Sequence, residues 1–399
     1  MTDQTLDFIN KSYTIAPAGR LKDISLSLIT STAPVPGAKV ELILPANFTY
    51  ADGSSGQRDF ITDHDGRIKV RGVKATPALG VYSLTAISGS QTACATVTVT
   101  EQGPIENIPI EGYPEEIAVS PDGTRAYVTN LVANAGKSTV SVIDTTTNRV
   151  LTDILVSSHP EGIAVSADSA RAYVSLNRSN TVSVIDTATH QVMASIPVGS
   201  SPRGVAVSPD GNRAYVCNNG SDTVSVIDTA TNQVLTSIQV DPGPYHIAVS
   251  PNSKRVYVCS GGSNIFSVIN TATDQVLTRI QTGSHSTHVV LSPDGSQAYV
   301  CTRDYTVLVI DTAMDEILTS IQLESQVSGI AVSPDGTRVY VSLSGTRSYS
   351  VIDTTSNQVL QTIELGWNPA GVAFSPDGTR VFICVRIDNV VSVIDAATV

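Results

Sequence analysis

From residue 104 onward, apolar and polar positions follow a pattern that repeats along the chain. The serine of a Ser-Pro-Asp-Gly-like turn recurs at intervals of 46, 42, 42, 42, 41 and 42 residues, at Ser120, Ser166, Ser208, Ser250, Ser292, Ser333 and Ser375. Each unit holds four short runs rich in Val, Ile, Thr and Tyr, bounded by turn residues, and none has sustained helical periodicity. Seven units of four predicted strands are typical of the blades of a β-propeller.

The last unit lacks one strand. It runs through a third predicted strand, Val390 to Asp395, and the sequence stops at Val399. Ahead of the first unit, residues 105–110 (IENIPI) align with the outer strand 235–240 (LTSIQV), with apolar residues at the first, fourth and sixth positions of both. We therefore predict that residues 105–110 form the outer strand of the last blade, because that edge would otherwise expose unpaired backbone groups.

Residues 1–103 contain no repeat. Their strand-like runs alternate apolar and polar positions, at residues 21–29, 39–44, 67–73, 81–86 and 93–100. This alternation predicts a β-sandwich. The expected fold is all-β, with an immunoglobulin-like β-sandwich at residues 1–103 and a closed seven-bladed β-propeller at residues 104–399, joined by the short linker Glu101–Pro104.

The composition argues against several classes of protein. No apolar run approaches the roughly 18 residues that a membrane-spanning helix needs. Five cysteines, an odd number, argue against a disulfide scaffold. The formal charge of −12 disfavours a nucleic-acid partner, because phosphate affinity depends mainly on Lys and Arg. The propeller carries the whole excess, with 27 acidic and 15 basic residues, whereas residues 1–103 have nine of each.

Twelve of the acidic residues occupy two recurring turn positions. They are Asp122, Asp168, Asp210, Asp294, Asp335 and Asp377 in the first turn, and Asp144, Asp186, Asp228, Asp311, Asp353 and Asp395 at the end of the third strand. Unit four has Asn252 and Asn270 instead, which keep the hydrogen-bond acceptor and lose the charge. This favours turn chemistry over a metal site. The recurrent arginines, such as Arg125, are predicted to pair with these aspartates.

The two faces of the predicted propeller differ in how constant their loops are. Loops after the first and third strands are nearly the same in every unit, whereas loops after the second and fourth strands vary greatly. In an antiparallel blade these two sets lie on opposite faces. We call them the constant face and the variable face, and we expect function on the variable face, at the mouth of the central channel.

Two positions just before each inner strand supply the candidate residues. The first is Glu115, Glu161, Arg203, Tyr245, Thr287, Ser328 and Ala370 along the units, and the second is Glu116, Gly162, Gly204, His246, His288, Gly329 and Gly371. Glycine is the default at the second position, so Glu116, His246 and His288 give up its backbone freedom. Nearby loops add His159, Asn368 and the single tryptophan, and residues such as Arg386 are expected further out. The predicted ligand-binding set is Glu115, Glu116, Glu161, Arg203, Tyr245, His246, His288, Arg303, Tyr305 and Trp367.

Four interpretations of this set remain open. In a catalytic one, His246 or His288 is a general base near neutral pH, Glu116 or Glu161 orients or protonates, and Arg203 holds an anionic group. In a second, the histidines and a glutamate bind a divalent metal ion, but adjacent blades place such ligands too far apart. In a third, the set binds a ligand without chemistry, and in a fourth it lines a water-filled channel. The mixture of polar residues favours binding, and we expect no metal and no cofactor.

The remaining candidates for chemistry have structural explanations. Cys217, Cys259, Cys301 and Cys384 occupy one equivalent position at the end of the second strand, where other units have Thr or Ser. A small buried side chain accounts for all of them, since free cysteine behaves as a small hydrophobe. The sequence contains no nucleophile elbow, no phosphate-binding glycine loop and no zinc pattern.

Specific motifs suggest relatives. Tyr127-Val128-Thr129-Asn130 spells YVTN, and residues 104–399 resemble the YVTN-family seven-bladed β-propellers, which include archaeal surface-layer proteins and bacterial exported proteins. These are similar in fold to propeller lactonases and streptogramin lyases. In the N-terminal region, residues 34–40, 62–67 and 80–86 resemble bacterial immunoglobulin-like domains of the invasin and intimin type.

From the channel-mouth residues we expect a recognition protein with a protein, glycan or small-molecule partner at the propeller face, and we expect a monomer. The alternative is a hydrolase or lyase, lactonase-like or streptogramin-lyase-like, that uses the histidines, glutamates and arginine at the channel mouth. The resemblance also implies the cell surface or the exterior. The free thiols and the lack of a signal peptide in this chain favour the cytoplasm as the alternative.

Overall fold

The computed structural model divides the chain into two compact units, Met1–Pro104 with Thr398–Val399 and Ile105–Ala397. The described residues are 4–8, 12–15, 24–30, 35–44, 48–50, 54–65, 67–70, 74–75, 80–88, 91–99, 106–131, 138–157 and 159–396. Within these ranges the regular elements are all β-strands, which confirms the predicted all-β class. The predicted linker, residues 101–104, lies outside them.

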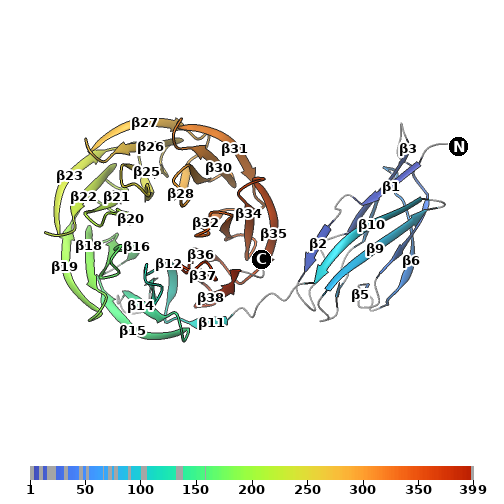
Figure 1. Ribbon diagram of the computed structural model, residues 1–399, viewed down its shortest axis with the longest axis horizontal. Helices are drawn as coiled ribbons and strands as arrows, with labels where there is room; N and C mark the ends of the chain where they lie inside the picture. Colours follow the sequence, from blue (N-terminus) through green and yellow to red (C-terminus); the bar gives the residue numbers. More distant parts are fainter. Residues whose placement is uncertain are drawn as a thin grey trace. The chain divides into compact units, whose positions relative to one another are not determined.

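The larger unit is a ring of seven four-stranded antiparallel sheets, the blades of a propeller (Figure 1). Blade one contains β12 (Tyr113–Val119), β13 (Arg125–Leu131), β14 (Ser138–Asp144) and β15 (Arg149–Val156). Blade two contains β16 (Pro160–Val165), β17 (Arg171–Leu176), β18 (Thr181–Asp186) and β19 (Gln191–Pro197). Blade three contains β20 (Pro202–Val207), β21 (Arg213–Asn218), β22 (Thr223–Asp228) and β23 (Gln233–Gln239).

The next three blades repeat this order, with the first strand innermost in each. Blade four contains β24 (Pro244–Val249), β25 (Arg255–Ser260), β26 (Ile265–Asn270) and β27 (Gln275–Gln281). Blade five contains β28 (Ser286–Leu291), β29 (Gln297–Thr302), β30 (Thr306–Asp311) and β31 (Glu316–Gln322). Blade six contains β32 (Val327–Val332), β33 (Arg338–Leu343), β34 (Ser348–Asp353) and β35 (Gln358–Glu364).

Blade seven joins the two ends of the ring. It contains β36 (Pro369–Phe374), β37 (Arg380–Val385) and β38 (Val390–Asp395), and its outer strand is β11 (Glu106–Pro109). β11 pairs antiparallel with β38, with Glu106 opposite Val393 and Pro109 opposite Val390. The ring is therefore closed by strand pairing between residues nearly 300 positions apart, and the third strand of the last blade has no free edge.

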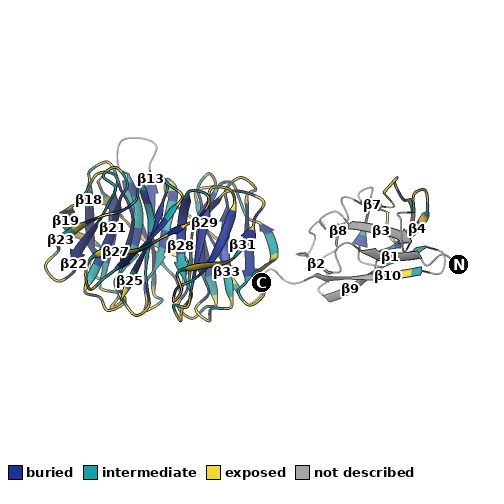
Figure 2. Ribbon diagram, turned by 90° about the horizontal axis from the view of Figure 1, so that it is seen from above, coloured by how far each residue is buried: buried dark blue, intermediate teal, exposed yellow. Residues whose placement is uncertain are grey.

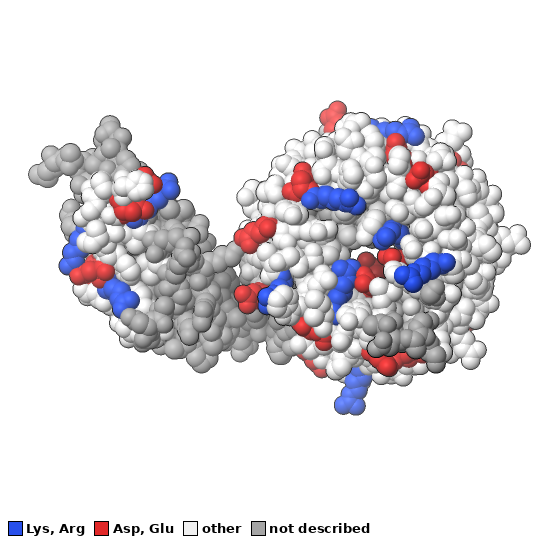
Figure 3. Space-filling model, turned by 180° about the vertical axis from the view of Figure 1, so that it is seen from behind, with Lys and Arg blue, Asp and Glu red and all other residues white. Residues whose placement is uncertain are grey.

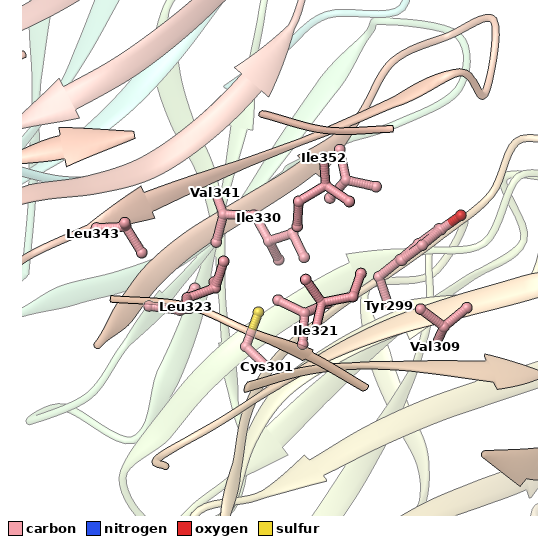
Figure 4. Close-up of a cluster of buried hydrophobic side chains, with 12 residues drawn as sticks. Tyr299, Cys301, Val309, Ile321, Leu323, Ile330, Val341, Leu343 and Ile352 are labelled. Atoms are coloured by element: carbon pink, nitrogen blue, oxygen red, sulfur yellow. The ribbon is translucent and has the colours of Figure 1, made fainter. Parts of the chain in front are cut away.

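The hydrophobic core of the ring lies between neighbouring blades. Each sheet packs both faces against its neighbours, so its middle strands are buried on both sides: β33 is buried at every position except Arg338. Figure 4 shows one such layer, in which Tyr299 and Cys301 of blade five pack with Ile330 and Val341 of blade six. Exposed positions concentrate on the outer strands and turns (Figure 2).

The four equivalent cysteines belong to these layers. Cys217, Cys259, Cys301 and Cys384 are free and have no exposed surface. Burial raises the pKa of each thiol, so the thiolate is disfavoured. This confirms the prediction that they act as small hydrophobic side chains.

The constant face is built from one repeated hydrogen-bond network. In blade one, Asp122 accepts hydrogen bonds from the Ser120 hydroxyl (2.6 Å) and the Thr124 amide (2.9 Å), as predicted for a turn aspartate. These bonds lower the pKa of Asp122. Arg125 pairs with Asp144, which ends the third strand of the same blade (2.9 Å). The corresponding Arg213 and Arg255 differ, since they reach Asp274 and Asp315 of the next blade.

The smaller unit contains two principal sheets. One has the order β1 (Gln4–Phe8), β3 (Ile24–Thr30), β7 (Arg67–Val70), and the other has the order β2 (Ser12–Ile15), β10 (Gln91–Val99), β9 (Gly80–Ser88), β4 (Lys39–Ile43), β6 (Gln57–Ile61). A short pair joins β5 (Phe48–Thr49) and β8 (Lys74–Ala75). Leu6 and Ile68 of the first sheet share one hydrophobic core with Val40 and Leu84 of the second.

Candidate functional site

A polar cavity of about 410 Å³ lies where the inner strands converge on the variable face. Seven of the ten predicted binding residues line it: Glu115, Glu116, Glu161, Arg203, Tyr245, His246 and His288. The rest of the lining is Leu131, His159, Gly162, Gly204, Thr287, Gln326, Val327, Ser328, Ser344, Asn368 and Arg386. On the propeller face shown in Figure 3, acidic and basic side chains gather around the central opening. We call this space the channel-mouth cavity.

A β-bulge at the start of the inner strands places these side chains. In blade one, the pairing of β12 with β13 jumps from Pro114 to Ile117, which leaves Glu115 and Glu116 outside the regular register. The same jump occurs in blades two, three, four and seven. Bulges re-aim side chains and are common next to binding sites. In these five blades they supply the two variable positions, whereas in blades five and six the shift leaves out one residue, between Ser286 and His288 and between Val327 and Gly329.

The default glycine at the second position serves close packing. A Cβ atom on Gly162 would lie 2.6 Å from the carbonyl oxygen of Arg203, and one on Gly371 would lie 2.8 Å from the Cα of Glu116. Neither glycine has a positive φ. The expectation that glycine provides backbone freedom here is therefore wrong, because what it provides is room for the neighbouring inner strand.

An ion pair spans the seam between blades one and seven. Nη2 of Arg386 lies 2.5 Å from Oε2 of Glu115, and its Nε donates to the same oxygen at 2.9 Å. Burial raises the pKa of Glu115, and the positive charge of Arg386 opposes that rise. The prediction that Arg386 lies further out from the channel is therefore wrong. This arginine reaches the cavity because closure of the ring brings blade seven beside blade one.

A second charged group links blades two and three. Glu161 contacts Nη1 of Arg203 at 3.2 Å through one oxygen and Nδ1 of His159 at 3.3 Å through the other. The guanidinium of Arg203 also lies over the ring of Tyr245, 4.7 Å from its centroid. Both arginines of the cavity therefore have carboxylate partners within it.

Glu116 differs from the other two glutamates because no basic side chain pairs with it among the described residues. It lines the channel-mouth cavity, where its Oε1 accepts only a long bond from the Ile117 amide (3.4 Å). Burial raises its pKa to about 7, against an ordinary value of 4.5. Near neutral pH this carboxyl group is thus poised between its acid and base forms.

The two buried histidines form an aromatic group with Tyr245. The rings of His246 and His288 have centroids 5.2 Å apart, and Tyr245 meets His288 edge-on at 5.9 Å. Nδ1 of His246 accepts a hydrogen bond from the Val289 amide (3.4 Å). Burial lowers the pKa of His246 to about 4 and that of His288 well below its ordinary value.

These histidines bear on two expectations. Burial disfavours the charged form of both rings, which weighs against either one as a general base that titrates near neutral pH. The argument that adjacent blades hold ligands far apart is wrong for this pair, since inner strands approach to backbone contact at the channel. Among the described residues, the one trio with metal-ligand spacing is Asp63, His64 and Asp65, which is exposed and lies in the smaller unit.

Three predicted binding residues lie outside the cavity lining. Trp367 lines a separate pocket and is 48% exposed, and Tyr305 is 44% exposed. Arg303 does not line the cavity, but both it and Tyr245 lie beside Gly261. A Cβ atom built on Gly261 would be 3.7 Å from Nη2 of Arg303 and 3.4 Å from the ring of Tyr245. Gln326 and Ser344 also line the cavity but were not among the predicted residues. Both are small or uncharged polar residues, so nothing in the sequence marks them as unusual.

Fold and site together define a β-propeller with a polar cavity at the centre of one face. Residues 202–398 match the family model of the seven-bladed β-propeller lactonases, and residues 83–213 match that of the YNCE-like β-propellers. The chain is similar to a solved structure of Kuenenia stuttgartiensis hydrazine synthase, with a TM-score of 0.66 and 26% identity over 75% of this chain and 99% of that one.

The other comparisons add little about function. No curated protein matches the chain. In total 1705 chains of solved structures match, so the fold is widespread and does not by itself select an activity. Among the described residues, no helix is long and apolar enough to cross a membrane.

Proposed function

We propose that the chain is a recognition protein whose channel-mouth cavity binds a small, uncharged, polar molecule. The observation that carries this proposal is the internal pairing of charge. Arg386 is matched by Glu115, and Arg203 by Glu161, so neither arginine offers an uncompensated charge to an anion. The volume of about 410 Å³ lies in the range of small-molecule sites.

The groups left over are suited to neutral hydrogen bonding. Tyr245, Thr287, Ser328 and Asn368 offer hydroxyl and amide groups around the cavity. Within the described part of the chain, Nδ1 of His288 and Nε of Arg203 are buried without a hydrogen-bond partner. Buried polar atoms are normally paired, so these two support a ligand or bound water that completes them.

A thermal-unfolding panel tests this function. The probes are myo-inositol, D-glucose and D-glucono-1,5-lactone, with Tyr245→Ala as the cavity variant. At 100 times its dissociation constant a ligand stabilises the native state by about 2.7 kcal/mol, enough to raise the unfolding midpoint by several degrees. We expect a saturable rise that Tyr245→Ala abolishes. His190→Asn, in a turn of the constant face where other blades have Asn148 and Asn232, is the matched control.

A lactonase-like hydrolase is the second candidate, supported by the family-model match over residues 202–398 and by Glu116. As a carboxylate, Glu116 would accept a proton from water as that water adds to a lactone carbonyl. The ring C–O bond then breaks, and Glu116 returns the proton to the departing oxygen. Glu116→Gln should abolish hydrolysis of D-glucono-1,5-lactone in a pH-stat while binding survives. Saturable binding of the lactone without catalysed hydrolysis would refute the hydrolase and leave recognition as the one remaining function of the two.

We further propose that residues 1–103 are an immunoglobulin-like spacer or second contact for the propeller, acting at the cell surface. The two sheets that share a core around Val40 and Leu84 support the sandwich, and the resemblance to invasin-type domains supports the location. Cell fractionation of the full chain in its native host tests the location. Recovery in the cytoplasm alone would refute it.

A further inference from the structure

A second pocket, of about 320 Å³, lies on the same face at the edge of blade six. Loops that follow β33 and β35 form it, and its lining is Thr346, Arg347, Glu364, Leu365, Gly366 and Trp367. None of these residues lines the channel-mouth cavity. Trp367 is the only tryptophan of the chain and is 48% exposed, so much of it is open to solvent.

The residue type at Arg347 departs from the repeat, although its backbone does not. This residue has a φ of 56°, in the left-handed region. The corresponding loops place Asn180, Asp222 and Asn389 at this position, with φ values of 55°, 57° and 54°, and blade five has Tyr305 there with a φ of 66°. Asn and Asp tolerate this conformation, whereas a long side chain without a local hydrogen bond does so less readily. The turn therefore does not explain the choice of arginine here.

The contacts of the Arg347 side chain explain better why an arginine stands at this position. Its guanidinium lies over the indole ring of Trp367. Unlike Arg203 and Arg386, it has no carboxylate within ion-pair distance among the described residues, even though Glu364 lines the same pocket. Its hydrogen-bond donors are thus left for a ligand.

The loop that carries Trp367 is held in place before any ligand binds. Oδ2 of Asp388 accepts a hydrogen bond from the Trp367 amide (3.1 Å), and the Ile387 amide donates to the Trp367 carbonyl (3.3 Å). The Leu365 amide donates to the carbonyl of Arg347 (2.9 Å), which ties the two loops together. Such preorganisation lowers the entropy lost on binding.

We propose that this pocket is a second binding site, independent of the channel-mouth cavity, that takes a residue of a neutral saccharide. The side of the indole that the Arg347 guanidinium does not cover offers a flat apolar surface for the C–H face of a sugar ring. Thr346, Arg347 and Glu364 offer donors and acceptors for its hydroxyl groups. The excess of acidic residues in the propeller, 27 against 15 basic ones, disfavours an acidic polymer.

The single tryptophan makes the test specific to this site. The full chain is titrated with maltotriose, cellotriose and chitotriose while Trp367 fluorescence is recorded. We expect a saturable change with at least one of them. Isothermal titration calorimetry should then show binding at least about tenfold weaker in Arg347→Asn and unchanged in Arg178→Asn, an exposed arginine in the corresponding loop of blade two.

Arg347→Asn also separates a binding role from a structural one. Because Asn suits the left-handed backbone, its unfolding midpoint should stay the same or rise by up to about 2 °C. Intact saccharide binding together with a lowered midpoint would overturn the proposal, and so would no response to all three sugars. Preference for hexaglutamate over the sugars would overturn the ligand class. Loss of myo-inositol binding in Arg347→Asn would contradict the independence of the two sites.

Discussion

The two faces of the propeller both carry charged residues, but these residues have different roles on each face. On the constant face, most charged side chains repeat from blade to blade, as Asp122 and Arg125 do, and satisfy a turn or a neighbouring strand. On the variable face, the charged positions differ from blade to blade, and Glu115 and Arg386 meet only because the ring closes. Repetition therefore marks what the fold requires, and departures from it mark where function has room to evolve.

The largest effect should come from breaking the seam ion pair. Arg386→Met leaves Glu115 without a cation in a largely buried position, which should lower the free energy of unfolding by about 2–4 kcal/mol. The matched change on the constant face, Arg338→Met, should lower it by about 1 kcal/mol or less, because Asp353 keeps its bond from the Ser356 amide (2.8 Å). Urea unfolding of both variants measures the difference, and equal losses would contradict the contrast between the faces.

Glu116 should make stability depend on pH in an unusual direction. Its pKa is raised to about 7 from 4.5, so between these values the folded state binds more protons than the unfolded state. Stability contributed by this group is complete below pH 4.5 and falls as pH rises toward and past 7, by about 3 kcal/mol in all. Glu116→Gln should remove this fall in urea unfolding curves measured from pH 5 to pH 8. An unchanged pH profile would show that the carboxyl group is solvated.

His246 should act in the opposite direction. Its pKa is lowered to about 4 from 6.5, so the unfolded state binds more protons between these values. Stability from this group is complete above pH 6.5 and falls on acidification toward and past pH 4, by about 3 kcal/mol in all. His246→Gln should flatten the acid limb of the profile, whereas His190→Asn on the constant face should leave it intact. The same acid limb in both variants would exclude His246 as its source.

The smallest effect is expected at a single turn of the constant face. Asp335→Ala removes acceptors for the Ser333 hydroxyl and the Thr337 amide (3.0 Å), and should lower the free energy of unfolding by about 1–2 kcal/mol. Ligand binding at the other face should not change. Calorimetric titration of this variant with myo-inositol checks the separation, and a weakened affinity would show that the faces are coupled.

The repeat made the ring predictable, because the period of the serines and the four runs per unit report directly on blades. Which positions face the channel also followed from the register of the units, as Glu116 and His246 illustrate. The partners of these residues did not follow from the sequence, because Arg386 meets Glu115 only through ring closure and the conformation of its loop. The lowered pKa of His288 comes from its burial, which no local pattern encodes. Trp367 stands out in the sequence as the single tryptophan. Its separation from the cavity could not be predicted, because it depends on where Asp388 anchors its loop.

Calorimetric titration of the full chain with D-glucose and with glucose 6-phosphate tests the central claim most directly. The two probes differ only in a phosphate group, and the claim is that paired charges make the channel-mouth cavity selective for an uncharged polar ligand. We predict saturable binding of glucose that Tyr245→Ala abolishes, and binding of the phosphate ester at least about tenfold weaker. Tighter binding of the phosphate ester, or no binding of glucose, would contradict the account.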